Sequence, residues 1–263
     1  MRIDIATLFP EMCEAVLSES IVGRARAEGL IEIHCHNIRD YSKNKHRHVD
    51  DTPYGGGMGM VLMADPVFDC FEAVCKEIGS RPYVVYMSPQ GKVLNQGIAK
   101  EYLETPNLFI ICAHYEGIDE RLIEEIVDAE ISIGDYVLTG GELPAMVFCD
   151  AIIRMIDGVL SDKECFEDES HYSGLLEYAQ YTRPAVWKGR EVPEVLLSGH
   201  HKNILEWRKK DAIKRTRIKR PDMYRRYLKS EEYAGIRAKR LKKLARLKKK
   251  LQKEKAKQTD NKN

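Results

Sequence analysis

The sequence predicts an α/β domain built on a mostly parallel sheet, followed by a small helical domain rich in basic residues. Short apolar segments alternate with helical patterns through the first 160 residues, the order expected of parallel strands joined by helices. Two of these segments, YVVYM (83–87) and LFIICA (108–113), are continuously apolar, which is typical of strands covered on both faces. Over residues 202–263, Lys and Arg outnumber Asp and Glu by 25 to 7.

The strands of the first domain are predicted from apolar periodicity. They are expected at 2–9, 31–38, 83–87, 108–113 and 131–133. Helical patterns lie between them, and the helix over 65–78 is expected to use Asp65 as its N-cap, with Pro66 at its first position. The other helices are expected at 10–27 and from starts near Asn95, Asp119 and Glu142.

The carboxy-terminal part is predicted to be helical and basic. A helix over 198–215 has Ser198 as a candidate cap, and its apolar stripe is expected to contain Ile204, Leu205, Trp207 and Ile213. Residues 236–257 repeat leucine at helical spacing, at positions 241, 244, 247 and 251. This spacing indicates a helical segment that docks on a partner before it frays.

The composition excludes several function classes. The seven cysteines contain no C-x-x-C pair, which argues against a zinc knuckle or a disulfide framework. No apolar run reaches the roughly 20 residues of a membrane helix, and the amino terminus lacks the order of a secretion signal, so we expect a cytoplasmic protein. P-loop and Rossmann glycine signatures are absent, which disfavours kinases, other NTPases and dehydrogenases.

The net charge of +1 conceals an asymmetry along the chain. Residues 1–201 contain 17 Lys and Arg against 34 Asp and Glu, whereas residues 202–263 have the opposite balance. A basic segment beside an acidic body points to a polyanionic partner such as nucleic acid, although charge alone leaves a solvated helix equally open. The acidic stretch 161–173 has little apolar content, so it is predicted to be a mobile linker.

Glycine is concentrated in three loops of the first domain. These are PYGGGMGMV (53–61), AHYEGIDER (113–121) and SIGDYVLTGGELP (132–144). The last two follow predicted strands and should lie at the carboxyl edge of the sheet, where open α/β folds bind ligands. A single glycine loop is most simply a tight turn, but three in one domain favour close approach of the backbone to a ligand.

Six longer segments resemble the bacterial tRNA (guanine-37-N1)-methyltransferases, which form the TrmD family of the SPOUT superfamily. They are DDTPYGGGMGMV (50–61), YMSPQGKVLNQ (86–96), ICAHYEGIDERLIEE (111–125), SIGDYVLTGGELPAM (132–146), GLLEYAQYTRP (174–184) and WKGREVPEVLLSGHH (187–201). They span nearly the whole chain except the tail beyond about Tyr233. The resemblance implies a trefoil-knotted domain over 1–160, a linker over 161–173, a helical tRNA-binding domain over 174–235 and a basic helical or disordered tail over 236–263.

The activity implied by the resemblance is methylation of N1 of guanosine 37 in tRNA, with S-adenosylmethionine as the methyl donor. In the family, three loops hold the donor in a bent conformation, and they correspond to 86–91, 113–117 and 132–141 here. The residues implied to bind it are Tyr86, Met87, Ser88, Pro89, Ala113, Tyr115, Glu116, Gly117, Ile133, Gly134, Asp135, Tyr136, Val137, Leu138, Gly140 and Gly141.

Three roles in the chemistry have candidate side chains. Guanine N1 carries a hydrogen that a base must remove, and the family places an aspartate just before its G-L-L block, where this chain has Glu169 with Asp168 ahead of it. We favour Glu169 over Asp168. Arg154 matches a family arginine that would polarise guanine O6, and Glu116 matches a family glutamate near the guanine or a magnesium ion.

The resemblance also implies partners. These are the anticodon arm of tRNA, a second copy of the chain in a homodimer, and magnesium, for which the sequence identifies no ligand cluster; no membrane or DNA partner is expected. Ala113 and His114 stand where many relatives have Gly and Arg, which leaves the local charge open. Two alternatives remain: an RNA-binding protein of this fold without catalysis, and a SPOUT enzyme that methylates another RNA position.

Overall fold

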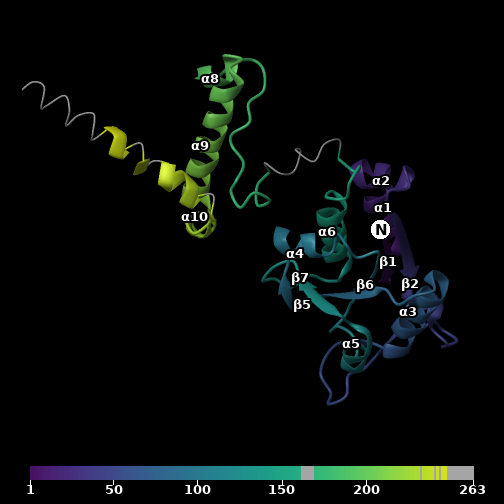
Figure 1. The fold of residues 1–263 in the computed structure, drawn as a ribbon. Coiled ribbons are helices and arrows are strands. Elements are labelled where there is room, and N and C mark those ends of the chain that lie inside the picture. Colours follow the sequence, from purple (N-terminus) through teal and green to yellow (C-terminus); the bar gives the residue numbers. More distant parts are fainter. Residues whose placement is uncertain (161–168, 232, 240, 243, 248–263) are drawn as a thin grey trace, which may run out of the picture. The chain divides into compact units, whose positions relative to one another are not determined.

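The computed structural model describes residues 1–160, 169–231, 233–239, 241–242 and 244–247. The chain divides into two compact units, Met1–Cys165 and Phe166–Asn263, and each is treated separately below (Figure 1). Asp168, Leu251 and most of the predicted linker and tail lie outside the described residues.

The first unit is built on a five-stranded parallel sheet in the order β2-β1-β6-β5-β7. The strands are β1 (Arg2–Thr7), β2 (Glu32–Asn37), β5 (Tyr83–Val93), β6 (Asn107–Cys112) and β7 (Ala129–Ser132). The continuously apolar prediction for β6 is confirmed, because Leu108 to Cys112 are all fully buried. A two-stranded ladder of β3 (Asp50–Asp51) and β4 (Val61–Leu62) lies outside this sheet and was not predicted.

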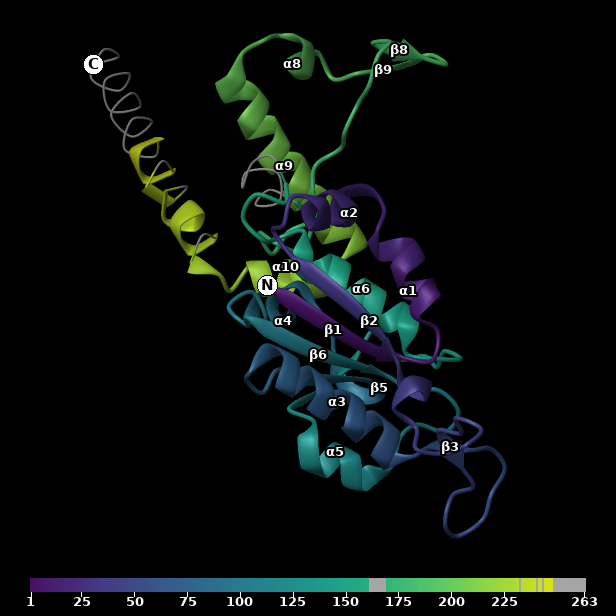
Figure 2. The same cartoon turned by 90° about the vertical axis from the view of Figure 1, so that its right-hand side faces the viewer.

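Helices cover both faces of the sheet. On one face α3 (Ala64–Ile78) packs against α5 (Glu120–Ile126), and on the other α6 (Glu142–Ile153) packs against α1 (Pro10–Leu17) and α4 (Gln96–Glu101) (Figure 2). The predicted starts near Asn95, Asp119 and Glu142 are confirmed, since Asn95 and Asp119 accept hydrogen bonds from the backbone as N-caps of α4 and α5. This mixed α/β unit is consistent with a SPOUT domain, and the knotted path stays a prediction.

Two helix predictions were wrong. The segment 10–27 forms two helices, α1 and α2 (Ser20–Ala27), because the chain turns at Ser20, which has φ of 56°. A Cβ at Gly23 would collide with the carbonyl oxygen of Ser18, so glycine permits this tight turn. The N-cap of α3 is Met63, and Asp65 lies within the first turn, where its charge still favours the helix amino terminus.

The second unit is mainly helical. It contains the hairpin of β8 (Val186–Trp187) and β9 (Arg190–Glu191), followed by α8 (Glu194–Leu197), α9 (His201–Lys219) and α10 (Pro221–Tyr227). Ser198 closes α8 and the N-cap of α9 is His200, so the predicted cap was wrong. Of the predicted apolar stripe, Ile204, Trp207 and Ile213 are half-buried, whereas Leu205 is 59% exposed. The fully buried positions of α9, Ala212 and Thr216, were not predicted.

No helix among the described residues is long and apolar enough to cross a membrane. The described residues between 233 and 247 have helical backbone, and Leu241, Leu244 and Leu247 among them are exposed. The docking of these leucines on a partner stays a prediction.

Candidate functional site

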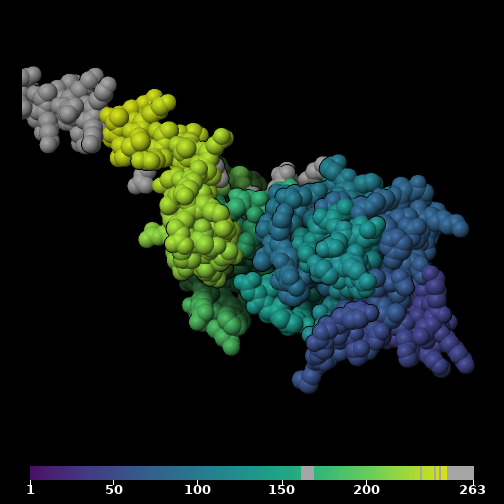
Figure 3. Space-filling model, turned by 90° about the horizontal axis from the view of Figure 1, so that it is seen from below, coloured from purple at the N-terminus to yellow at the C-terminus, as the bar shows by residue number. Residues whose placement is uncertain are grey.

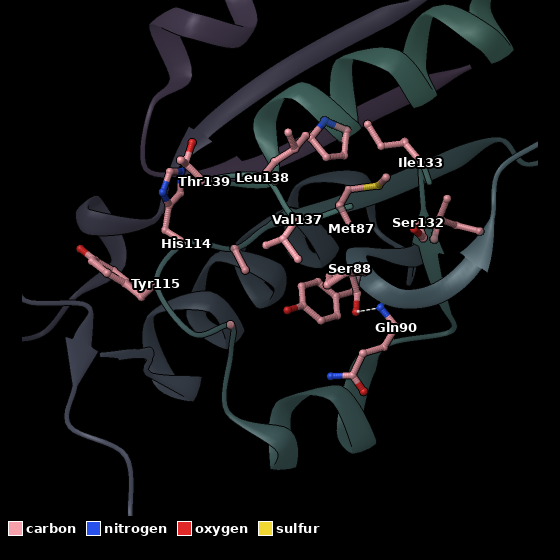
Figure 4. Close-up of a pocket in the computed structure, with 18 of the residues that line it drawn as sticks. Met87, Ser88, Gln90, His114, Tyr115, Ser132, Ile133, Val137, Leu138 and Thr139 are labelled. Atoms are coloured by element: carbon pink, nitrogen blue, oxygen red, sulfur yellow. Dashed lines mark hydrogen bonds between the residues drawn. The ribbon is translucent and has the colours of Figure 1, made fainter. Parts of the chain in front are cut away.

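The main candidate site is a pocket of about 260 Å³ at the carboxyl edge of the sheet (Figure 4). Three loops form it: the first pocket loop (86–91) within β5, the second (113–117) after β6 and the third (132–141) between β7 and α6. Because β5, β6 and β7 are parallel, their carboxyl ends meet at this edge. The picture shows Met87 and Val137 converging from two loops, whereas Tyr115 points away.

The first pocket loop is a bulge in β5. The pairing of β5 with β7 shifts between Met87 and Lys92, which frees the residues between them from the ladder. Ser88 is buried there, and its hydroxyl oxygen accepts a hydrogen bond of 3.2 Å from the backbone N–H of Gln90. A Cβ at Gly91 would collide with the backbone of Glu130 and Ile131, so this position has to be glycine. The bulge therefore opens the strand where the pocket needs polar backbone groups.

The second pocket loop turns sharply after β6. Tyr115 and Gly117 have φ of 61° and 113°, and the Gly117 N–H donates to the carbonyl of His114 at 3.1 Å. The N–H of Glu116 donates to the carbonyl of Met60 at 2.9 Å, so this loop is tied to the glycine-rich segment 53–61. That segment stands out from the first unit in Figures 2 and 3, and its Tyr54 and Met58 are almost fully exposed.

The third pocket loop is anchored at its end and exposed in its middle. The Gly141 N–H donates to the carbonyl of Ala113 at 2.9 Å, and a Cβ at Gly141 would lie 2.7 Å from the Cα of Cys112. In contrast, Tyr136 and Val137 are 56% and 82% exposed. The anchored end holds the second and third loops together, and the middle of the loop is open to a ligand or a partner.

A polar network lies behind the second and third loops. His114 Nε2 is 2.7 Å from Oε2 of Glu142, and the Thr7 hydroxyl donates to the other carboxylate oxygen at 2.6 Å. Glu142 and Thr7 are both buried. Burial and the charge of Glu142 raise the pKa of the Cys112 thiol well above its usual value. This thiol therefore stays neutral and is no candidate nucleophile.

One phenol in the wall is also held in its neutral form. Burial raises the pKa of Tyr86 to about 12, so its hydroxyl remains a hydrogen-bond donor. A Cβ at Gly117 would lie 3.3 Å from this hydroxyl, which places the tyrosine directly against the second pocket loop. The walls thus combine apolar side chains with backbone and hydroxyl groups, a chemistry that fits a nucleoside with an apolar ring face and polar edges.

The structure brings together nearly all of the residues predicted to bind the donor. Every one of them lines the pocket except Gly134 and Asp135, which belong to the third loop without facing the cavity. The additional lining residues are Gln90, His114, Ile131, Ser132, Thr139 and Pro144. Gln90, His114, Ser132 and Thr139 directly adjoin predicted residues, so adjacency in the chain was the available signal for them. Ile131 lies within β7 and Pro144 in the first turn of α6.

The predicted catalytic residues belong to different elements, and Glu169 belongs to a different unit from the other two. Glu116 is exposed and belongs to the pocket wall. Arg154 is the half-buried C-cap of α6, outside the pocket lining. Glu169 is half-buried in a turn of the second unit. Among the described residues, no group of three or more His, Cys, Asp or Glu side chains is placed to hold a metal ion.

The second unit offers a basic surface. Basic side chains stand exposed along α9 and α10, which form the green to yellow surface in Figure 3. They are Lys202, Lys210, Lys214, Arg217, Lys219, Arg225 and Arg226, and the exposed Lys229 follows shortly after α10. A surface with this density of positive charge suits the phosphates of a nucleic acid.

Comparison with known proteins gives a consistent result. Residues 1–226 match the family model described as tRNA (Guanine-1)-methyltransferase TrmD. A protein of Ruminiclostridium cellulolyticum is 59% identical over 224 residues, which cover 85% of this chain and 96% of that protein. One of Lachnospira eligens is 55% identical over 235 residues, 89% of this chain and 100% of that protein. Both are named tRNA (guanine-N(1)-)-methyltransferase.

The matched region contains all three pocket loops and most of the basic surface, so the match covers the features that define the site. The family expected from the sequence segments is thereby confirmed, and the chain belongs to the TrmD family of tRNA (guanine-N1)-methyltransferases.

Proposed function

We propose that this protein transfers the methyl group of S-adenosylmethionine to N1 of guanosine 37 in tRNA. The observation that carries the proposal is the pocket, because the three loops that the resemblance assigned to the donor meet around one cavity. Membership of the TrmD family supports S-adenosylmethionine as the donor and tRNA as the substrate. Such a substrate suits a cytoplasmic enzyme.

The chemistry requires a base and a group that stabilises negative charge. We assign Glu169 as the base that accepts the N1 proton, while the bond from N1 to the methyl carbon forms and the bond from that carbon to sulfur breaks. S-adenosylhomocysteine leaves as a neutral thioether. Arg154 donates hydrogen bonds to guanine O6, where charge builds up as N1 loses its proton. Unstacking and extrusion of the guanine would bring N1 to the donor.

Magnesium is proposed from the resemblance alone. The described residues form no cluster of three or more His, Cys, Asp or Glu side chains that could hold a metal ion, and Glu116 is a carboxylate of the pocket lining. A magnesium ion held by one carboxylate takes its other ligands from water and from the substrate. No step above depends on the metal.

A homodimer is proposed from apolar side chains exposed on the first unit. Met12 and Val16 on α1 are 41% and 53% exposed, and Leu143 and Val147 on α6 are each 48% exposed. Since α1 packs against α6, these side chains belong to neighbouring helices, and the exposed middle of the third pocket loop precedes α6 in the chain. A second copy of the chain would cover this surface from water.

Val147→Asp is expected to convert the homodimer into a monomer, because it buries a charge in an apolar interface. Light scattering after size-exclusion chromatography should give a mass near the 30.2 kDa of one chain, against twice that for the parent protein. Val186→Asp, at the equally exposed start of the β8–β9 hairpin, is the matched control and should leave the mass unchanged. A parent protein that is monomeric at micromolar concentration would contradict the proposed assembly.

The activity is tested with an unmodified tRNA transcript and labelled S-adenosylmethionine. The expected product is 1-methylguanosine, and replacing guanosine 37 should abolish its formation. Transfer that survives this replacement would indicate another RNA position. Binding of the donor and tRNA without transfer would indicate the RNA-binding alternative.

The tail is expected to add tRNA affinity that depends on salt. The family match ends at residue 226, and residues 237–263 contain thirteen Lys and Arg against two acids. Deleting 237–263 should weaken tRNA binding by about tenfold at physiological salt and should flatten the plot of log affinity against log salt, because fewer counterions are released. Filter binding at several salt concentrations measures both the tRNA affinity and its dependence on salt. Deleting only 258–263, which has no net charge, should change neither; an unchanged slope in the long deletion would refute the role.

A further inference from the structure

Glu142 is a buried carboxylate at the start of α6, directly after the third pocket loop, and the proposed chemistry does not use it. Its side chain is 3% exposed, and both of its oxygens are engaged, one by Thr7 and the other by His114. Because a carboxylate can only accept hydrogen bonds, the Nε2 of His114 must carry the proton between them. A buried carboxylate is costly unless such partners satisfy it, so the three side chains stay together.

This network joins three segments that are distant in the sequence. Thr7 ends β1, His114 belongs to the second pocket loop, and Glu142 is the first residue of α6, directly after the third pocket loop. The Thr7 hydroxyl also accepts a hydrogen bond of 2.9 Å from the N–H of Phe9, which fixes the exit of β1. The Glu142 carboxylate therefore connects the end of β1 to both the second and the third pocket loops.

Packing leaves the imidazole of His114 little freedom. The ring centroids of Phe9 and His114 are 4.9 Å apart on one side. On another side, a Cβ at Gly140 would collide with the imidazole, so the ring lies directly on the backbone of the third pocket loop. His114 and Gly140 also form a backbone bridge. The second and third pocket loops are thus in contact through both side chain and backbone.

We propose that His114 and Glu142 are positioning residues that set the affinity for S-adenosylmethionine by fixing the spacing of the second and third pocket loops. The inference rests on the proposed function only for the identity of the ligand. A ligand binds more weakly to a site made by two loops when the loops become ordered only on binding, because the free energy of ordering them reduces the binding free energy. The pair removes this cost by holding the loops in place beforehand.

The test measures donor affinity of the full-length protein by calorimetry, and KM and kcat with tRNA. His114→Ala should raise the dissociation constant and the KM for S-adenosylmethionine by about tenfold, the usual effect of losing a hydrogen bond to a charged group. At saturating donor, kcat should stay within about threefold. His114→Gln should restore most of the affinity, because its amide can still donate to Glu142. Thr7→Val should give an intermediate loss.

His34→Ala is the matched control, because His34 lies on β2 with a half-exposed side chain away from the pocket lining, and it should leave affinity unchanged. Thermal unfolding of each variant checks that it is folded, and Thr7→Val keeps the test decisive if His114→Ala fails to fold. Equal donor affinity in parent, His114→Ala and Thr7→Val would overturn the inference, and so would an equal loss in His114→Ala and His114→Gln. Failure of the parent protein to bind the donor would instead refute the proposed function.

Discussion

Glu169→Gln is expected to slow methyl transfer to tRNA by about 100-fold or more, while the affinity for S-adenosylmethionine stays unchanged. General base catalysis contributes factors of about 100 to 10,000, and an amide cannot accept the N1 proton that the carboxylate takes up. All residues that line the pocket belong to the first unit, so the substitution changes none of the side chains proposed to contact the donor. Single-turnover measurement of 1-methylguanosine formation, beside calorimetry of the donor, separates the two effects.

Two further variants serve as a matched control and as a test of the neighbouring acid. Glu191→Gln changes an exposed glutamate of the β8–β9 hairpin in the same way and should leave the rate unchanged. Asp168→Asn tests the neighbouring acid, and a loss confined to this variant would move the role of base from Glu169 to Asp168. Full activity in Glu169→Gln would remove Glu169 from the mechanism.

Gly141→Ala is expected to lower the stability of the first unit by about 2 kcal/mol or more and to weaken donor binding by more than tenfold. The backbone of Gly141 has φ of −83°, which alanine adopts readily, so the effect has a steric origin. The new Cβ would lie 2.7 Å from the Cα of Cys112 and 2.9 Å from the N of Ala113. These are backbone atoms of the last residue of β6 and the start of the second pocket loop, and they can yield only if the pocket deforms.

Thermal unfolding and calorimetry with S-adenosylmethionine measure the two losses. Gly235→Ala is the matched control, because no atom lies within 4 Å of its added Cβ and the surrounding backbone is helical. That substitution should leave donor binding unchanged and raise helix stability by up to about 1 kcal/mol. A Gly141→Ala protein with parental stability and affinity would show that the loops can separate without cost.

The positions of most strands and helices along the chain could be predicted because their causes are local, whereas the order of the strands in the sheet was not predicted. Buried strands such as β6 are continuously apolar, and Asn95 and Asp119 supply caps whose side chains bond to the adjacent backbone. The division of 10–27 into two helices could not be predicted in this way. It depends on a positive φ at Ser20, a residue type with no strong preference for that conformation, and on the close approach of Gly23 to Ser18.

The pocket was predictable in outline for a different reason. Its loops follow or interrupt parallel strands, and the resemblance of several sequence segments to the TrmD family identified which loops bind the donor. The bulge of β5 between Met87 and Lys92 was not visible in the sequence, because it arises from the register with β7, where Met87 and Lys92 both pair with the distant Ile131. The pairing of His114 with Glu142 was equally hidden, since residues 28 positions apart meet only after the second and third loops are folded.

The helix α6 has apolar side chains on two sides. One side buries Ala145, Phe148 and Ile152 in the first unit, and the other presents Leu143 and Val147 to the proposed partner. The same helix begins with Glu142, which anchors the pocket. In a homodimer built on this surface, assembly and pocket geometry are linked through one rigid element, and association stabilises the folded state by mass action. The specific activity of such a homodimer would depend on the enzyme concentration. When the enzyme is diluted below the dissociation constant of the homodimer, the separated chains would bind the donor more weakly.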